Sequence, residues 1–496
     1  MLSALASESN KTYTENGALS NRSTNNHCLN FFATCGALRN QPETVALRLF
    51  ARAYVESPDL AMRTLFYARD IRGGLGEREL FRDILSWLAR KRPHSVRKNI
   101  DLIPEYGRWD DLLALMETPC EKDVVDRIQH QLRDDLNALD ADGQVSLLAK
   151  WLPSVNTASS ETKLRARRLC KLLGMTEREY RRTLSRLRAR IDILEHRLCR
   201  KDYSFDYSRQ PSGALHKYRE AFLRHDRERY RAFLDAVLRG EKTLHAGTIY
   251  PYEIIRACLP EFRDWSFGPL RSKTLSPEMI QSLDASWNSL PDYGDRSNSL
   301  AVIDGSGSMF DGGNPLPAEV ALSLGIYFAE HNTGFFRNHF ITFSHTPRLV
   351  ELKGDNIVDR TEYCMSFDEC SNTNLRATFG LILEAALENG LSQEDLPETL
   401  YIISDMELDE GVDTDKTLFH EIKEVFEARG YRLPTLVYWN VNSRSEQFPV
   451  SKDENGTVLV SGASPSLFQM VIGQDVSPES FMLSVLNSPR YIGITA

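Results

Sequence analysis

Five oxygen-bearing side chains in the second half of the chain are suited to bind one divalent cation. They are Asp304, Ser306, Ser308, Thr373 and Asp405. The first three follow the apolar run 300–303 and the last follows the apolar run 400–403, and each run is typical of a buried strand. Carboxylate and hydroxyl oxygens are hard ligands that favour Mg²⁺ or Mn²⁺ over zinc. The simpler interpretation of the first group is a Gly/Ser-rich loop between a strand and a helix.

The segments around these residues alternate between strand and helix patterns. Apolar residues recur at helical spacing over 317–331 and 416–429, whereas 339–344, 436–439 and 457–460 are short apolar runs typical of strands. Such alternation predicts an α/β doubly wound sheet with parallel strands and helices on both faces. In sheets of this kind, ligand sites form at the carboxyl ends of the strands. We therefore expect the five side chains to face one crevice.

The first part of the chain has a helical pattern from residue 27 to about residue 285. Apolar residues fall three or four positions apart, with charged residues between them. The expected helices include 43–55, 60–71, 78–91, 122–138, 160–173, 177–199 and 219–239. Pairs of helices joined by short breaks favour an all-α solenoid or ring of the HEAT type, although the sequence contains no clean internal repeat.

Three units are expected along the 496 residues. Residues 1–26 are rich in Ser, Thr and Asn, which indicates a flexible arm, and they are followed by a helical domain over 27–290 and an α/β domain over 297–496. The eight cysteines form no CxxC pair, and no apolar run is long enough to cross a membrane. With no signal-peptide pattern at the start, these features predict a cytoplasmic protein that does not enter membranes.

Charge is distributed unevenly along the chain. The formal net charge is −9 overall, but it is −17 over 301–496 and +11 over 161–240. A basic stretch of this kind can attract nucleic acid, whereas the acidic half cannot do so through its overall field. The candidate RNA-binding residues are Arg165, Arg168, Lys171, Arg181, Arg182, Arg186, Arg188 and Arg190. The alternative is a solvated helix face with internal pairs such as Glu177 with Arg181.

Aromatic residues accompany the basic stretch. They are Tyr203, Tyr207, Tyr218 and Tyr230. Aromatic rings near basic side chains can stack on unpaired bases, as single-stranded RNA recognition requires.

Two resemblances extend this interpretation. The order Asp-x-Ser-x-Ser, Thr, Asp resembles the metal-ion-dependent adhesion site of von Willebrand factor A domains, with all five positions filled. The segments "LFYARDIRGGLGERELFRDIL", "IPEYGRWDDLL", "AKWLPS", "AGTIYPYEII" and "VIDGSGSM" are similar to an uncharacterised family that joins a helical half to such an A domain. That family is a distant relative of the Ro autoantigen proteins, whose helical TROVE module forms a ring of HEAT-like repeats. The resemblance implies binding of single-stranded or small structured RNA.

Three classes of function follow from these observations. The first is a non-catalytic RNA-binding component of a ribonucleoprotein, in which the helical domain binds RNA and the A domain binds Mg²⁺ or Mn²⁺. The second is a metal-dependent protein scaffold without nucleic acid, in which a protein partner supplies an acidic ligand to the metal. The third is an enzyme, which the sequence disfavours because the serines lack a nucleophile elbow and two carboxylates at one metal are too few for two-metal chemistry.

Overall fold

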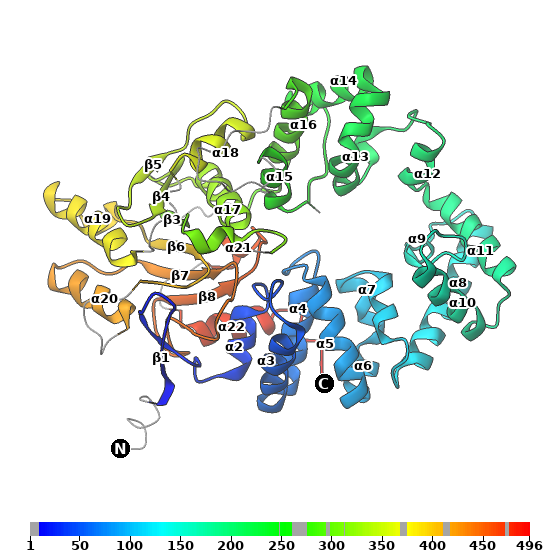
Figure 1. Ribbon diagram of the computed structural model, residues 1–496, viewed down its shortest axis with the longest axis horizontal. Helices are drawn as coiled ribbons and strands as arrows, with labels where there is room; N and C mark the ends of the chain where they lie inside the picture. Colours follow the sequence, from blue (N-terminus) through cyan, green and yellow to red (C-terminus); the bar gives the residue numbers. More distant parts are fainter. Residues whose placement is uncertain are drawn as a thin grey trace.

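The computed structural model describes residues 9–247, 249–259, 275–293, 298–311, 313–367, 374–409, 417–471 and 476–496. Figure 1 shows the chain as a closed ring, in which an arc of helices leaves the α/β half and returns to it. The α/β half occupies one side of the ring, and the C-terminus lies against the first helices of the helical half. The chain therefore has a helical first half and a C-terminal half built on a mixed sheet, as the sequence predicts.

The helical half follows the predicted apolar periodicity, except that the expected helices 177–199 and 219–239 are each divided in two, after Ile191 and at Asp226. Its helices are α2 (His27–Thr34), α3 (Glu43–Glu56), α4 (Pro58–Arg69), α5 (Arg78–Lys91), α6 (Pro93–Lys98), α7 (Ile103–Tyr106), α8 (Glu121–Asp140), α9 (Leu148–Trp151), α10 (Ser160–Leu172), α11 (Glu177–Ile191), α12 (Leu194–Cys199), α13 (Ser212–His225), α14 (Arg227–Leu238), α15 (Pro251–Cys258) and α16 (Pro277–Asn288). Local signals set their ends. Thr176 and Glu179 form a reciprocal capping box that begins α11.

The C-terminal half contains one six-stranded sheet in the order β5-β4-β3-β6-β7-β8. The strands are β3 (Ser299–Asp304), β4 (His339–Phe343), β5 (Leu349–Glu351), β6 (Thr399–Ser404), β7 (Thr435–Asn440) and β8 (Thr457–Ser461). All neighbours are parallel except β5, which pairs antiparallel with β4 at the edge. The central strands β3 and β7 are buried along their whole length. Because both faces of these strands are buried, their sequences are almost continuously apolar.

Helices cover both faces of this sheet. They are α17 (Pro317–His331), α18 (Ile357–Met365), α19 (Leu375–Glu388), α20 (Leu418–Ala428), α21 (Leu467–Met470) and α22 (Pro478–Leu486). On one face of the sheet, Phe379 of α19 packs against Phe426 of α20. On the opposite face, Phe328 of α17 and Phe468 of α21 pack against Tyr401 of β6. Helix α17 approaches β3 so closely that a Cβ at Gly325 would collide with the side chain of Ile303.

The hydrophobic core does not stop at the boundary between the two halves. One cluster runs from the first helices through α15 and α16 and continues along one face of the sheet. Polar contacts cross the same boundary: Arg256 pairs with Glu319 at 2.6 Å, and the Trp287 indole donates to Glu330 at 2.6 Å. The two halves are therefore packed as one body.

The ring closes where the first helices meet the end of the chain. Helix α2 contacts β8 and α22, and the Gly36 backbone lies against Ser461 with no room for a Cβ. Beyond α22, Arg490 forms an ion pair with buried Asp70, which also accepts a 2.8 Å hydrogen bond from the Tyr491 hydroxyl. Contacts between the first helices and the C-terminal segment therefore close the ring.

The N-terminal segment differs from the flexible arm expected over residues 1–26. Strands β1 (Lys11–Tyr13) and β2 (Leu19–Asn21) form an antiparallel hairpin against the loops that follow β6 and β7. The Thr14 hydroxyl donates to the Leu408 carbonyl at 2.6 Å, and the Asn21 N–H donates to the Phe448 carbonyl at 2.9 Å. The Ser/Thr/Asn composition that indicates disorder instead supplies hydrogen bonds to a neighbouring surface.

Candidate metal centre and basic cavity

Four of the five predicted metal ligands lie at the carboxyl edge of the sheet. Asp304 ends β3 and Asp405 follows β6, and these two strands are direct neighbours in parallel register. Ser306 and Ser308 lie in the turn after β3, with their hydroxyl oxygens 3.1 Å apart. The fifth, Thr373, lies outside the described residues. The doubly wound topology thus brings together side chains that are a hundred positions apart in the sequence.

The two aspartates are buried and poorly compensated. Both are only 2% exposed, and in each the Oδ2 oxygen has no hydrogen-bond partner among the described residues. Burial and the charge of Asp405 raise the pKa of Asp304 to about 7, although the backbone N–H of Ser306 donates to its Oδ1 at 2.8 Å. Two adjacent buried carboxylates destabilise each other unless a cation or a proton neutralises them.

These residues fit a hard divalent cation. The orphaned carboxylate oxygens and the two serine hydroxyls are all oxygen donors, which suit Mg²⁺ or Mn²⁺. Within the described part of the chain, no group of three His, Cys, Asp or Glu side chains is placed to hold a metal ion. A cation at this edge would therefore depend on the hydroxyls as well as on the carboxylates.

Three charged residues that the sequence did not single out surround this edge. Arg444 lies between Asp405 and Glu15, at 3.6 Å and 2.7 Å from their carboxylate oxygens. Buried Glu407 accepts a 2.7 Å hydrogen bond from the Glu15 N–H, and burial raises its pKa despite a hydrogen bond from the Ser445 hydroxyl. No spacing rule could have found this group, because Glu15 reaches the edge only through the hairpin.

The predicted RNA-binding residues separate into two groups. Arg181 and Arg188 of α11 line the inside of the ring. The others do not line this cavity, and several pair with carboxylates. Arg165 pairs with Glu161, Arg168 with Glu117 and Glu121, Arg186 with Asp140, and Arg190 with Asp142. Lys171 and Arg182 are exposed. The basic stretch therefore does not form one continuous RNA-binding face.

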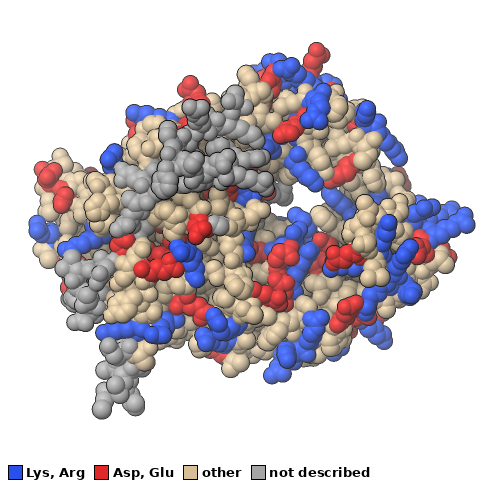
Figure 2. All heavy atoms as spheres, viewed as in Figure 1, with Lys and Arg blue, Asp and Glu red and all other residues tan. Residues whose placement is uncertain are grey.

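The ring encloses a large cavity of about 2100 Å³. Figure 2 shows its opening through the molecule, with Lys and Arg side chains beside it. Lys and Arg outnumber acidic residues in the lining, whose basic members are Arg72, Arg108, Lys150, Arg181, Arg188, Arg197, Arg200 and Lys217. The acidic members are Asp192, Glu195, Asp202 and Glu253. Burial and the charge of Arg69 lower the pKa of Arg108.

Aromatic rings lie among these basic side chains. The guanidinium of Arg108 lies 4.6 Å from the ring centre of Trp151, and the Lys150 ammonium lies 5.4 Å from the same ring. Trp109 and Tyr218 also line the cavity. Tyr207 and Tyr230, which we expected to be able to stack on bases, are instead buried in the cluster with Phe222 and Phe233. Those two predictions are wrong, because both rings pack in the core, Tyr207 from a short 3-10 turn (Tyr207–Arg209) and Tyr230 from the buried side of α14.

Arg188 has a mainly structural role. Its guanidinium donates to the carbonyls of Ala149 and Leu152 at 2.7 and 2.8 Å and to the Ser154 hydroxyl at 2.7 Å. It thereby fixes the segment that presents Trp151 to the cavity.

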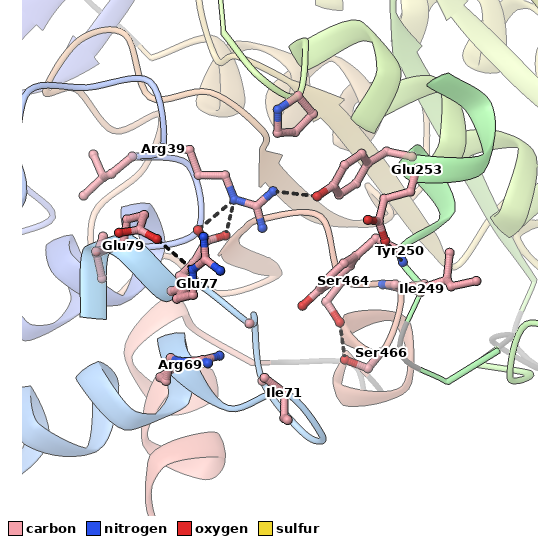
Figure 3. A pocket seen from close by; sticks show the side chains of 18 of the residues that line it. Arg39, Arg69, Ile71, Glu77, Glu79, Ile249, Tyr250, Glu253, Ser464 and Ser466 are labelled. Carbon is pink, nitrogen blue, oxygen red and sulfur yellow. Dashed lines mark hydrogen bonds and ion pairs between the residues drawn. The ribbon is translucent and has the colours of Figure 1, made fainter. Parts of the chain in front are cut away.

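A second cavity of about 590 Å³ lies at the seam where the ring closes. It shares Ile71, Arg72, Arg108 and Glu253 with the large cavity. Figure 3 shows Arg39 at its centre, bonded to buried Glu77 at 2.7 Å and to the Tyr252 hydroxyl at 3.2 Å. These contacts join the first helices directly to α15. Arg39 and Glu77 are thus engaged in this contact, whereas Arg69 pairs with Asp111 and Arg78 pairs with Glu79.

The fold and the two sites define a ring-shaped protein with a basic interior and a cluster of carboxylates and hydroxyls at the carboxyl edge of its sheet. A family model described as a domain of unknown function, DUF2828, matches residues 14–129 and 122–293, more than half of the chain. The chain therefore belongs to the DUF2828 family. A second model, a domain of unknown function named DUF7788, matches residues 298–484.

Two further similarities concern whole proteins. The uncharacterized protein L728 of Acanthamoeba polyphaga mimivirus is 28% identical over 520 residues, covering 96% of this chain and 87% of that protein. The crystal structure of the Deinococcus radiodurans RO (RSR) protein matches 90% of this chain and 92% of its own, with 14% identity and a TM-score of 0.35. A likeness at this score is too weak to establish a shared fold. Among the described residues, no helix combines the length and apolar character needed to cross a bilayer.

Proposed function

We propose that this protein is a non-catalytic, RNA-binding component of a ribonucleoprotein, and that it holds single-stranded RNA inside its ring. The observation that supports this proposal most strongly is the lining of the large cavity, where basic side chains such as Lys150, Arg181, Arg200 and Lys217 accompany the partly buried rings of Trp109, Trp151 and Tyr218. Proteins that bind single strands combine a positive groove for the phosphates with aromatic platforms for the bases. The sequence motifs that resemble an uncharacterised family, itself a distant relative of the Ro proteins, agree with this proposal.

The chemistry of the lining favours unpaired RNA over duplex. Trp151 already attracts two cationic groups to its face, and a base stacked on the same ring would gain about 1–3 kcal/mol. Bases inside a duplex are stacked on each other and cannot reach such a ring. Lys150, Arg181 and Lys217 would contact the phosphates of the same strand, since all three line one cavity.

The second part of the proposal concerns the carboxyl edge of the sheet. Asp304, Asp405, Ser306 and Ser308 would hold Mg²⁺ or Mn²⁺ there, in the manner of a von Willebrand A domain. The cation would neutralise the two buried carboxylates and offer a coordination position to an acidic group. The chain's own residues provide the oxygen donors and a buried, low-dielectric setting.

A metal-dependent protein scaffold without nucleic acid is the second candidate. The net charge of −17 over residues 301–496 favours it, because a surface of that charge repels RNA and attracts basic partners. The pairing of Arg165, Arg168, Arg186 and Arg190 with carboxylates also reduces the charge that the outer helices could offer to phosphate.

Two matched four-residue variants of the full chain test the RNA proposal. The interior variant replaces Lys150, Arg181, Arg200 and Lys217 with Gln, and the exterior variant replaces Arg165, Lys171, Arg182 and Arg186 with Gln. Filter binding of a labelled oligouridine at two salt concentrations is the measurement. We expect the interior variant to lose most of its affinity and to reduce the salt slope by about 3, since each phosphate contact contributes roughly 0.7 for single strands.

The exterior variant loses the same formal charge and serves as the control. It should bind almost as well as the wild type at both salt concentrations. Equal losses in the two variants would show that binding follows overall charge and not the cavity. If the wild-type protein bound no RNA, the scaffold candidate would take the place of this proposal.

A further inference from the structure

Arg444 occupies an unusual position at the carboxyl edge of the sheet. One of its terminal nitrogens lies 3.6 Å from Asp405 Oδ2, and the other lies 2.7 Å from Glu15 Oε2. Asp405 belongs to the proposed metal site, whereas Glu15 belongs to the N-terminal hairpin. A guanidinium between two carboxylates compensates their negative charge, as a metal cation bound between them would.

The backbone around Glu15 is held firmly on the sheet edge. Its N–H donates to Glu407 Oε2 at 2.7 Å, and the Asn16 side-chain amide donates to the Glu407 carbonyl at 2.7 Å. The Thr14 hydroxyl donates to the next carbonyl along, that of Leu408, at 2.6 Å. The tip of the hairpin is thus fixed beside residues that directly follow Asp405.

The side chains of the bridge are much less restrained than this backbone. The side chain of Glu15 is 50% exposed and that of Arg444 is 28% exposed, whereas that of Asp405 is fully buried. Arg444 can therefore turn toward solvent while Glu15 stays beside the edge. The buried carboxylate of Asp405 has no such freedom. Its Oδ2 accepts no hydrogen bond from the described residues and lies 3.6 Å from Arg444, so it depends on a cation close to it.

We propose that Glu15 is the acidic group that this edge recognises, supplied by the chain itself, and that Arg444 holds the place of the divalent cation until the cation binds. The inference rests on the metal site proposed above. Arg444 and a divalent cation compete for Asp405, because like charges at one oxygen repel each other. When the cation binds, Arg444 moves outward and Glu15 faces the cation, so the hairpin is held more tightly. By linkage, an intact hairpin raises the affinity for the cation.

Calorimetric titration of the full chain with Mn²⁺ tests this proposal in four proteins: the wild type, Arg444→Gln, Glu15→Gln and the double variant. We expect Arg444→Gln to bind Mn²⁺ about tenfold more tightly, a modest factor because the pair is partly exposed. Glu15→Gln should bind more weakly than the wild type. The double variant should bind more weakly than Arg444→Gln alone, because Glu15 then acts on the cation itself.

Hydrogen–deuterium exchange over residues 9–26 provides a second readout that does not depend on affinity. Mn²⁺ should slow exchange in the hairpin of the wild type and of Arg444→Gln, but not in Glu15→Gln. The matched controls are Arg432→Gln and Glu384→Gln, which replace exposed residues of the same half. Both should behave as the wild type does.

The outcomes separate this inference from the metal site on which it rests. If Mn²⁺ binds but the double variant matches Arg444→Gln, Glu15 acts only by holding Arg444 and the inference is wrong. If Mn²⁺ binds and leaves the exchange of residues 9–26 unchanged, the inference is also wrong. If neither the wild type nor Arg444→Gln binds Mn²⁺, the metal site itself fails and the inference fails with it.

Discussion

At the scale of single residues, the carboxyl edge of the sheet combines groups that stabilise the fold only when their charge is compensated. Asp304 and Asp405 are both buried, and in each the Oδ2 oxygen accepts no hydrogen bond from the described residues, although Asp405 Oδ2 lies 3.6 Å from Arg444. The residue types and their order were enough to predict this pair from the sequence. Arg444 and Glu15 could not be predicted in the same way, because no local pattern reports that a hairpin at the other end of the chain lies beside Asp405.

Asp304 makes the stability of the metal-free protein depend on pH. Its folded-state pKa is raised to about 7 from an ordinary value of 3.8, so between these values the folded state binds a proton that the unfolded state has lost. Stability should therefore fall as pH rises from about 4 through 7 in the presence of a chelator, and Mg²⁺ should restore it at the upper end.

The variant Asp304→Asn should remove both effects. The neutral amide ends the repulsion with Asp405, so the melting temperature in chelator should be higher than that of the wild type at pH 7.5. Added Mg²⁺ should then have no effect. Thermal melting at pH 5, 6 and 7.5, with and without Mg²⁺, is the measurement. A variant that melts lower than the wild type at pH 7.5 in chelator, or that still responds to Mg²⁺, would contradict this account.

At the scale of elements, apolar periodicity was sufficient to place most helices and all five parallel strands of the sheet. Runs such as 300–303 and 400–403 are buried on both faces, and this is the setting in which sequence patterns are clearest. The N-terminal hairpin has only three residues in each strand, and polar side chains hold it in place, so its sequence is indistinguishable from that of a flexible arm. Tyr207 and Tyr230 were predicted to be accessible to bases but are buried, because aromatic residues that lie near arginines in the sequence can also be core residues.

Helix α17 packs closely against β3 near the metal edge. In Gly325→Ala the added methyl group meets the side chain of Ile303, which must move within a filled core. We expect the variant to lose about 1–3 kcal/mol of stability in chemical denaturation. Gly380→Ala is the control, because its Cβ would meet open space on α19, and it should be neutral or stabilising by up to about 1 kcal/mol. Equal stability of the two variants would contradict the close packing described here.

At the scale of the whole molecule, the ring is a property that the sequence could suggest but not establish. Closure depends on contacts between segments that are remote in the chain, such as Arg490 with Asp70 and the Gly36 backbone with Ser461. These contacts leave no periodic signal. The charge distribution was visible in the sequence, but it did not show that only Arg181 and Arg188 of the predicted set line the cavity.

The shared core predicts how the chain responds to a cut between its halves. A protease site engineered into residues 294–297 should give two fragments that stay associated under native conditions, because α15 and α16 pack on α17 and α18. Size-exclusion chromatography of the cleaved protein should show one peak at the intact size. Two separate, folded fragments would show that the halves are independent domains.

The central claim is that RNA lies inside the ring, and photochemical cross-linking tests it most directly. A single-stranded oligonucleotide that contains 4-thiouridine is bound to the full chain and irradiated, and the cross-linked peptides are identified by mass spectrometry. The account predicts cross-links to peptides that contain Trp151 or Tyr218, whose side chains line the cavity beside Lys150 and Lys217. Cross-links confined to peptides within residues 163–171, with none from the cavity lining, would contradict it.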